Sequence, residues 1–497
     1  METSIKYFAE DFIKNIIELQ DKFFMDPKQL PAYVYGISDE LQKLGLLMIK
    51  ESLESIDRTL CKSRRRKDKY YIERHDNKQL ITSLGKVDFS KTLFTDKETR
   101  QEMQYLIDDI MGLSKHQRLT DDAVAKVLEE ATDTSYRRGG DSLVGEGTIS
   151  KAAVKELIHG LKFPEDNFTA PRFKKVVEYL YIDADEDHFS LQFQKEKGDL
   201  QRNANGRKLN VAMNKLIYVY EGIEPEAPKS KRNRLVGRHF FCRSGDMDNR
   251  NLWDEVYRYI DCTYDIKSIK KIYLNSDGGA WIKAGLNRLA DVTFVLDEYH
   301  ISQSLGRMTR HMKDSQDDAL TELKEAIRNR TKNEFIEVAE RVISLAPGER
   351  EMEKSLTEMN YILSNWSAAK LRLKHRAGVC GCSAEGHVYH VLSSRMSTLA
   401  MGWSRKGASQ MALLREWKYN GRDFLELARY QHVHEHPMAV GAEEICTSVN
   451  EMLRSEMAGR TDAQRMIGKY VDAITHTWSI EMQKKERFYS NHWISSM

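Results

Sequence analysis

The chain has 497 residues, 41% of them hydrophobic, and a formal net charge of +2. Its length predicts two to four domains, and its hydrophobic content is sufficient for real cores. No stretch approaches 18 consecutive apolar residues, and the first residues have neither the basic leader nor the apolar run of a signal peptide. These features argue against a membrane-spanning or secreted chain, and we expect a soluble, cytoplasmic protein. Because the net charge is nearly neutral, an acidic partner such as DNA would bind through local basic patches.

The cysteine and proline contents further limit the class of protein that the sequence can form. Four of the six cysteines are widely scattered, which argues against a disulfide framework and predicts reduced thiols. Only 8 prolines, with many Leu, Glu, Lys, Arg and Met residues, predict a helix-rich fold interrupted by a few strands.

The N-terminal part combines helices with a basic segment. Residues 5–60 have the periodicity of two amphipathic helices, and residues 61–75 hold seven Lys and Arg against two acids. β-prone segments follow at 70–72, 79–81 and 86–94, which predicts a small basic β element. Two patches are candidates for phosphate binding, although each has a solvated surface as its alternative: Arg64, Arg65, Arg66, Lys67 and Lys69, and then Lys229, Lys231, Arg232, Arg234 and Arg238.

Residues 121–161 suggest a helix-turn-helix. An apolar face around Ala123–Leu128 is followed by a short helix at 135–143 and a break at Gly145–Gly147. Ser150 is then a suitable N-cap for a helix over 151–161. Three packed helices without a role in nucleic-acid binding are the alternative.

The middle of the chain is rich in β-strand patterns. Strands are predicted at 176–183, 189–193, 216–220, 238–242, 269–274 and 293–296, with helices at 251–260 and 281–289. This order predicts a mixed sheet flanked by helices. Residues 300–374 are highly charged and predicted to be helical, and residues 411–497 are predicted to be mostly helical.

Three carboxylates have chain contexts that can bring them to one metal site. Asp185 and Asp277 are each predicted at the end of a strand, and Glu385 opens a predicted helix. Such a set can hold Mg²⁺ ions on a phosphodiester. Strand alternation favours Asp185 over its neighbours Asp183 and Asp187, which remain alternatives. Glu221, after the strand at 216–220, is a further candidate.

Four ordered strings carry a family resemblance: Tyr-Ile-Asp-Ala-Asp-Glu-Asp-His (181–188), Leu-Asn-Ser-Asp-Gly-Gly-Ala-Trp-Ile (274–282), Leu-Asp-Glu-Tyr-His (296–300), and Ala-Glu-Gly-His-Val-Tyr-His-Val-Leu-Ser-Ser-Arg-Met-Ser (384–397) with Met-Gly-Trp-Ser (401–404). They resemble the DDE transposases of bacterial insertion sequences, specifically the ISLre-type family allied to the mutator-like group. The similarity covers nearly the whole chain. It departs at the first acid, where mutator relatives tend to have Asp-Gly.

The resemblance implies an RNase H-like catalytic domain, with a helical insertion before the last acid. Asp185, Asp277 and Glu385 would be catalytic and would bind Mg²⁺, for which Mn²⁺ can substitute. His300, in an Asp-x-x-His element with Asp297, would touch a phosphate or DNA; a hydrogen bond at the helix start is its alternative. Arg395 and Trp403 would be auxiliary residues. The implied activity is DNA cleavage at element ends and 3′-hydroxyl strand transfer, with double-stranded DNA as partner, a homo-oligomer on DNA and a location at the nucleoid.

Two other functions compete. A protein derived from a transposase could bind DNA without catalysis. Cys380, Cys382, His387 and His390 could instead form a zinc site of a hydrolase, and His432, His434 and His436 form a second His-x-His pattern.

These inferences combine into an α+β or α/β multidomain protein. The expected parts are N-terminal helices (1–60), a basic β-prone element (61–118), DNA-binding helices (119–165), the first catalytic part (166–300), the helical insertion (301–375), the second catalytic part with Glu385 (376–430) and C-terminal helices (431–497).

Overall fold

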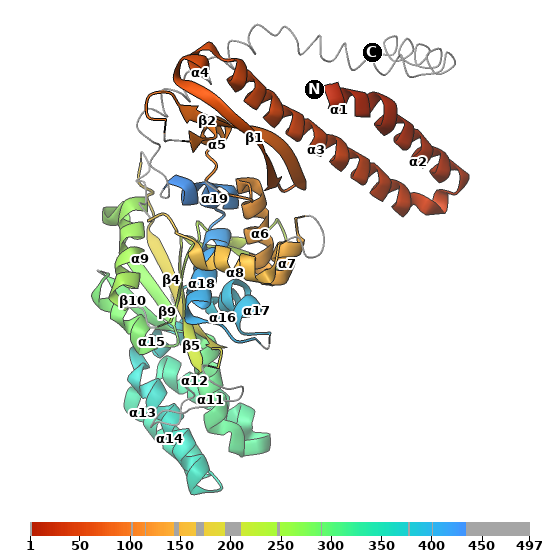
Figure 1. Ribbon diagram of the computed structural model, residues 1–497. Coiled ribbons are helices and arrows are strands. Elements are labelled where there is room, and N and C mark those ends of the chain that lie inside the picture. The colour runs from red at the N-terminus through yellow and green to blue at the C-terminus, as the bar shows by residue number, and fades with distance from the viewer. Residues whose placement is uncertain are drawn as a thin grey trace. The chain divides into compact units, whose positions relative to one another are not determined.

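The computed structural model describes residues 2–100, 103–114, 116–143, 149–165, 173–193, 210–245, 249–289, 291–375, 378–399 and 401–433. The fold is mixed α+β, as the sequence predicts, and divides into two compact units (Figure 1). The first comprises residues 1–131, 135–154 and 424–497, and the second comprises 132–134 and 155–423. None of the helices in the described ranges is long and apolar enough to cross a bilayer.

The first unit starts with a series of helices: α1 (Glu2–Tyr7), the π-helix η1 (Phe8–Phe12), α2 (Ile13–Met25), the 3₁₀ turn η2 (Pro27–Gln29), α3 (Leu30–Lys62) and α4 (Arg64–Lys69). The break between α2 and α3 is at Asp26, whose side chain accepts a hydrogen bond from the Lys28 amide at 3.2 Å. This hydrogen bond caps η2, so α2 and α3 are separate helices. Their separation agrees with the two helices predicted for residues 5–60. The basic run 64–69 is helical.

A long hairpin follows, formed by β1 (Tyr70–Ile81) and β2 (Lys86–Asp96), with the short strand β3 (Met103–Gln104) and helix α5 (Leu106–Met111). Gly85 has φ +148°, and its amide donates to Thr82 Oγ1 at 3.1 Å, which closes the turn. The predicted segments 70–72 and 79–81 are therefore two ends of one strand. Leu60, Phe89, Phe94 and Ile107 bury the hairpin against α3 and α5.

The three helices expected at 121–161 are present as α6 (Asp121–Asp133), α7 (Tyr136–Asp141) and α8 (Lys151–Gly160). Ser135 caps α7, and Ser150 Oγ accepts from the Ala153 amide at 3.2 Å, as predicted for an N-cap. The predicted break at Gly145–Gly147 lies outside the described residues, as do residues 434–497 with His434 and His436. The last described helix is α19 (Phe424–Val433).

The second unit contains a five-stranded sheet in the order β10-β9-β4-β5-β8. Its strands are β4 (Tyr179–Ser190), β5 (Val211–Tyr220), β8 (His239–Ser244), β9 (Lys271–Ser276) and β10 (Val292–Leu296). Strands β4, β5 and β8 pair antiparallel, whereas β9 is parallel to both β4 and β10. A separate hairpin, β6 (Gly222–Pro225) with β7 (Asn233–Val236), was not predicted.

One prediction in this sheet is wrong. Residues 176–183 and 189–193 are not two strands, because β4 runs without interruption from Tyr179 to Ser190. It pairs with β5 from Tyr181 to Ser190, so the carboxylates in between do not end it. Asp185 therefore lies inside a strand and not after one.

The two faces of the sheet differ in chemistry. One face presents Leu180, Ile182 and Ala184 of β4 to helix α9 (Asn249–Thr263), which buries Trp253 and Val256 there. The 3₁₀ turn η3 (Ile266–Ser268) leads from α9 to β9. The other face presents Tyr181, Asp183 and Asp185, because side chains alternate along a strand. This polar face carries the candidate site.

The remaining helices follow in chain order: α10 (Ala280–Lys283), the 3₁₀ turn η4 (Ala284–Asn287), α11 (Glu298–Thr309), η5 (Arg310–Ser315), α12 (Gln316–Asn329), α13 (Lys332–Ser344), α14 (Glu349–Ser364), α15 (Trp366–Leu373), α16 (Ala384–Val388), the π-helix η6 (Tyr389–Ser393), α17 (Ser394–Met396) and α18 (Arg405–Tyr419). The single helix predicted at 281–289 is thus α10 followed by η4. Helices α11–α15 (Figure 1) form the helical segment predicted for 300–374, with a core that includes Leu305, Leu323, Phe335 and Ile362.

Candidate active site

Strand β4 places three aspartates on the polar face of the sheet. Asp183, Asp185 and Asp187 alternate with Ala184 and Glu186, so they point the same way. Asp183 is fully buried, and Asp187 Oδ1 accepts from Ser397 Oγ at 3.0 Å. Of the three, only Asp185 belongs to a group of side chains that could hold an ion.

That group contains Asp185, His300 and Glu385, whose ligand atoms all lie within 4.8 Å of one another. His300 Nε2 is 3.5 Å from Glu385 Oε1. His300 is in the first turn of α11, which Asp297 caps by accepting from the Tyr299 amide at 3.2 Å. Glu385 is in the first turn of α16, where a carboxylate is favoured by the helix dipole. The cap at the start of α11 is therefore Asp297, and His300 faces Glu385.

Asp277 lies directly after β9, as predicted. Its Oδ1 accepts from the Gly279 amide at 2.9 Å, and Tyr361 donates to its backbone carbonyl at 2.7 Å. It is not a member of the 4.8 Å group. Its charge nevertheless acts on Asp185, since it is one of the causes that raise the Asp185 pKa.

Burial, together with the charges of Glu385 and Asp277, raises the pKa of Asp185 to about 7. A buried carboxylate beside two others is stabilised in its charged form by a cation. The donor set fits a divalent metal, because carboxylate oxygens suit Mg²⁺ and Mn²⁺ and an imidazole nitrogen suits Mn²⁺. Asp185, His300 and Glu385 would hold such an ion.

We expect Asp185→Asn to stabilise the metal-free protein at pH 8 and to leave its stability nearly unchanged at pH 4. The unfolded pKa is about 3.9 and the folded pKa about 7, so the folded state binds the proton more tightly. The contribution of Asp185 to the free energy of unfolding is therefore largest below pH 4. This contribution falls by up to about 4 kcal/mol as the pH rises from the unfolded pKa through the folded pKa, at ~1.4 kcal/mol per pH unit. Thermal unfolding in EDTA at both pH values measures the difference; equal melting temperatures at pH 8 would contradict it.

A buried polar network supports the site, and no local pattern in the sequence points to it. Asp183 accepts from Tyr218 at 2.6 Å, Tyr220 at 3.1 Å, Asn275 at 2.7 Å and the Ser383 amide at 3.1 Å. Four donors satisfy the buried carboxyl group of Asp183 and give it a structural role. The alternative assignment of Asp183 as the first metal-binding acid is therefore not supported by its hydrogen bonds.

Arg372 of α15 joins the segments that precede the site residues. Its guanidinium donates to Leu296 O at 3.1 Å, to Asn275 Oδ1 at 2.5 Å and to Cys380 O. These acceptors lie two to five residues before Asp277, His300 and Glu385. Arg372 is buried, with 3% exposure, so its donors depend on these acceptors.

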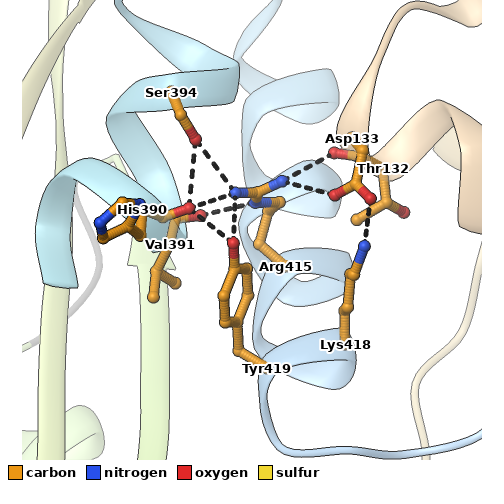
Figure 2. Close-up of polar contacts among 8 residues, drawn as sticks. All are labelled: Thr132, Asp133, His390, Val391, Ser394, Arg415, Lys418 and Tyr419. Atoms are coloured by element: carbon orange, nitrogen blue, oxygen red, sulfur yellow. Dashed lines mark hydrogen bonds and ion pairs between the residues drawn. The ribbon is translucent and has the colours of Figure 1, made fainter. Parts of the chain in front are cut away.

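Arg415 of α18 holds the π-helix that continues from α16. Figure 2 shows its guanidinium between the turn 390–394 and the end of α6. It donates to Val391 O at 2.6 Å, to His390 O, and to Asp133 Oδ1 at 2.9 Å. Lys418 also pairs with Asp133. The Glu385 helix is thus fixed on its C-terminal side by a buried arginine, and π-helices are frequent at functional sites.

The other predicted site residues lie elsewhere. The Arg395 guanidinium is 4.9 Å from the centre of the Trp403 ring, and both side chains are buried. Trp403 Nε1 donates to Met396 O at 2.9 Å. Glu221 pairs with Lys175 at 2.6 Å and accepts from Tyr264, so its partners give no support for a metal-binding role.

The cysteine and histidine cluster does not form a zinc site in the part of the chain that is described. The only group of at least three potential metal ligands there is that of Asp185, His300 and Glu385. Burial raises the pKa of the Cys382 thiol well above its ordinary value, and His387 Nδ1 is hydrogen-bonded to Ser383 O at 3.0 Å. A buried neutral thiol is a poor ligand. In the first unit, His432 pairs with Asp121 at 2.7 Å.

The Lys and Arg side chains of the two basic patches differ in exposure and in their hydrogen-bond partners. Arg64, Lys67 and Lys69 are exposed on α4, whereas Arg66 is half-buried and donates to Tyr70 O and Cys61 O. The Arg65 side chain lies outside the described part. In the second unit, Lys229, Lys231 and Arg232 are exposed around the β6–β7 hairpin, and Arg234 pairs with Glu224 at 2.6 Å. Arg66 thus has structural hydrogen bonds within the first unit, and phosphate binding by the two patches stays a prediction.

The fold and the site define a mixed α+β protein with a candidate acidic metal site on one face of a five-stranded sheet. The chain belongs to an uncharacterised protein family, UPF0236, whose model matches residues 28–431. Two UPF0236 proteins of Caldanaerobacter subterraneus subsp. tengcongensis are each 33% identical over 84% of this chain, covering 84% and 80% of their own lengths. A UPF0236 protein of Streptococcus gallolyticus is 22% identical, covering 77% of this chain and 80% of its own.

Among solved structures, the Drosophila P element transposase strand transfer complex matches 74% of this chain and 94% of its own chain. The sequence identity is 10% and the TM-score is 0.24, which is too low to establish a common fold.

Proposed function

We propose that this protein is a DNA transposase that cuts the ends of a mobile element and joins them to target DNA. The observation that carries the proposal is the convergence of Asp185, His300 and Glu385 within 4.8 Å on the polar face of the sheet, beside Asp277. The sequence resemblance to DDE transposases supports it, and the strand order suits an RNase H-like domain. One Caldanaerobacter relative has a name that joins eleven designations, as expected for a protein encoded at several places in a genome.

The chemistry consists of two in-line substitutions at phosphorus. In the first, a water oxygen forms a bond to phosphorus while the bond to the 3′ oxygen breaks, and that oxygen takes up a proton to give a free 3′-hydroxyl. In the second, this 3′ oxygen bonds to a target phosphorus, loses its proton, and displaces a target 3′ oxygen. Bound Mg²⁺ or Mn²⁺ would supply Lewis-acid stabilisation of the charge that develops on phosphate. Asp185 and Glu385 would hold the ion through carboxylate oxygens, and His300 would hold it through an imidazole nitrogen.

A cleavage assay tests the proposal. The purified protein is incubated with a plasmid that carries its gene and natural flanking DNA, in Mg²⁺, in Mn²⁺ or in EDTA, and new 3′ ends are mapped. We expect metal-dependent ends at fixed positions with the wild type and none with Glu385→Gln, while both bind the DNA. Binding without cleavage would favour a non-catalytic DNA-binding protein, and equal cleavage by Glu385→Gln would exclude this site.

The exposed cations of α4 are expected to neutralise DNA phosphates. Replacing Arg64, Lys67 and Lys69 with alanine should weaken binding to all DNA sequences and reduce the slope of log affinity against log salt by up to about 0.9 for each phosphate that is no longer neutralised. Fluorescence anisotropy at several salt concentrations measures the slope. Alanine at the exposed Lys14, Lys22 and Lys28 makes the same change in charge and serves as the control. An equal slope in the two variants would mean that α4 does not bind the DNA backbone.

A further inference from the structure

Two exposed tyrosines lie beside the candidate metal site in the second unit. Tyr299 precedes His300 in the first turn of α11, and the centres of the two rings are 5.4 Å apart. Tyr389 follows Glu385 by four residues along α16 and η6, so these two side chains lie one helical turn apart. Tyr299 is 54% exposed and Tyr389 is 50% exposed, so both rings are accessible to a ligand.

The metal group is also open to solvent on the side of these rings. The side chain of Glu385 is 54% exposed, and that of His300 is 22% exposed. On the Glu385 helix, Ala384 and Val388 are buried, whereas Glu385 and Tyr389 are exposed. A ligand that reaches an ion at Glu385 therefore approaches from the side on which Tyr389 lies.

The Tyr299 ring is held in position without being covered. Gln303 Nε2 donates to the Tyr299 hydroxyl at 3.3 Å, and Gln303 Oε1 accepts from Arg307 at 2.6 Å. The three residues follow one row of α11 at intervals of four residues. These contacts restrict the tyrosine side chain, so less conformational entropy is lost when a ligand stacks on its ring.

A cation lies near the helix that carries Tyr389. The Arg238 guanidinium is 5.6 Å from the centre of the Phe240 ring, and the Phe240 ring is 5.7 Å from the ring of His387. Arg238 itself is exposed. The surface that leads away from Glu385 thus combines an accessible aromatic ring with an accessible positive charge.

We propose that Tyr299 and Tyr389 stack on bases of the DNA strand that is held at the metal site, and that Arg238 pairs with a phosphate of the same strand. Stacking on aromatic rings, with cations along the backbone, is the general mode of binding single-stranded nucleic acid. Because the rings belong to the helices that supply His300 and Glu385, they would hold the strand next to the bond that is cleaved. The inference rests on the proposed function, since it takes the ligand to be the DNA substrate.

Binding of a single strand tests the proposal without any cleavage. The probes are a dT12 oligonucleotide and its fully abasic analogue, titrated with the full-length protein in Ca²⁺, which takes carboxylate ligands as Mg²⁺ does. Tyr299→Ala and Tyr389→Ala remove the rings, whereas Tyr299→Phe and Tyr389→Phe remove only the hydroxyl groups. Tyr257→Ala is the control, because Tyr257 is also exposed, at 43%, but belongs to α9, which covers the other face of the sheet.

We expect the wild type to bind dT12 at least about fivefold more tightly than the abasic analogue, and each alanine variant at Tyr299 or Tyr389 to lose most of this discrimination. The phenylalanine variants and Tyr257→Ala should retain it, because their stacking rings are intact. None of these substitutions changes a charge, so the slope of log affinity against log salt should stay that of the wild type. No discrimination by the wild type, or unchanged discrimination in both alanine variants, would overturn the proposal.

The opposite result is expected for the cation. Arg238→Ala should reduce the salt slope by about 0.7 for one phosphate that is no longer neutralised, and should leave the discrimination between dT12 and the abasic analogue unchanged. Lys332→Ala removes an exposed charge from the helical segment and should change neither quantity. An unchanged slope for Arg238→Ala would reject its pairing with a phosphate.

A measurement on the unaltered protein keeps the test valid if an alanine variant does not fold. A dT12 strand with 5-iododeoxyuridine at its centre forms a covalent adduct with a stacked aromatic side chain under ultraviolet light, and mass spectrometry of the peptides identifies the residue. We expect adducts at Tyr299 and Tyr389. Adducts formed only at other residues would overturn the proposal.

The outcomes separate this inference from the proposed function. Metal-dependent cleavage by the wild type together with unchanged base discrimination in the alanine variants would reject the stacking role and keep the transposase. Reduced discrimination in those variants, without any cleavage by the wild type under any metal, would keep a single-strand binding site and reject the transposase.

Discussion

Asp277→Asn is expected to lower the single-turnover rate of metal-dependent DNA cleavage at least about 100-fold, while the dissociation constant for DNA stays within about twofold. The substitution keeps the size of the side chain and its hydrogen bond to the Gly279 amide, but removes the negative charge. Several kcal/mol of transition-state stabilisation depend on a correctly held ion, so removal of one charge beside it is costly. Rates in Mg²⁺ and in Mn²⁺, with DNA affinity measured in parallel, provide the test.

The control is Asp291→Asn, which makes the same change at an exposed position before β10. The comparison also tests whether Asp277 is needed at the metal site, since it is outside the 4.8 Å group of Asp185, His300 and Glu385. A normal rate for Asp277→Asn would mean that these three side chains are a sufficient site and that the predicted role of Asp277 is wrong.

The sequence predicted the elements that local pattern determines. The apolar run that ends at Leu274 and the Gly278-Gly279 pair indicated a strand followed by a turn, and the structure has β9 end at Ser276. The alternation of Tyr181 and Ile182 predicted opposite faces, and Ile182 is indeed in the core packed on α9. Hydrophobic periodicity and turn-forming residues determine structure over only a few positions, so they can be recognised in the sequence alone.

The continuity of β4 could not be predicted in this way. Carboxylates at 183, 185 and 187 indicated a turn, because acids are unfavourable inside strands. Their hydrogen-bond partners are distant in sequence: Tyr218 is 35 residues from Asp183, and Ser397 is 210 residues from Asp187. Only the fold brings these donors to the strand. The carboxylates inside β4 are thus stabilised by tertiary contacts, which the local sequence does not show.

Arg372 and Arg415 escaped prediction for a related reason. Their acceptors are mostly backbone carbonyls, such as Leu296 O and Val391 O, which carry no side-chain signal. In a highly charged helical stretch, an arginine is normally expected to be solvent-exposed. Burial of both guanidiniums, at 3% and 2% exposure, identifies them as structural supports of the site.

The second large effect is expected at Arg372. Lysine keeps the charge but presents one ammonium in place of a planar fork, so it cannot reach Leu296 O, Asn275 Oδ1 and Cys380 O together. Buried acceptors left without donors cost about 1–3 kcal/mol each, so Arg372→Lys should lower the melting temperature. It should also loosen the segments that lead to Asp277, His300 and Glu385, which are the groups near the proposed ion.

The discriminating measurement is the affinity for Mn²⁺, determined by calorimetry well below the melting temperature. Removing a residue that supports a metal site typically weakens metal binding 10- to 100-fold, and we expect a change of about that size for Arg372→Lys. Arg328→Lys is the control, because Arg328 also donates to a backbone carbonyl of the helical segment, Leu373 O at 2.8 Å. Within the described ranges it has no hydrogen bond to Leu296, Asn275 or Cys380. It should lower stability and retain Mn²⁺ affinity. If Arg372→Lys is less stable yet binds Mn²⁺ as the wild type does, Arg372 holds the fold and does not position the site.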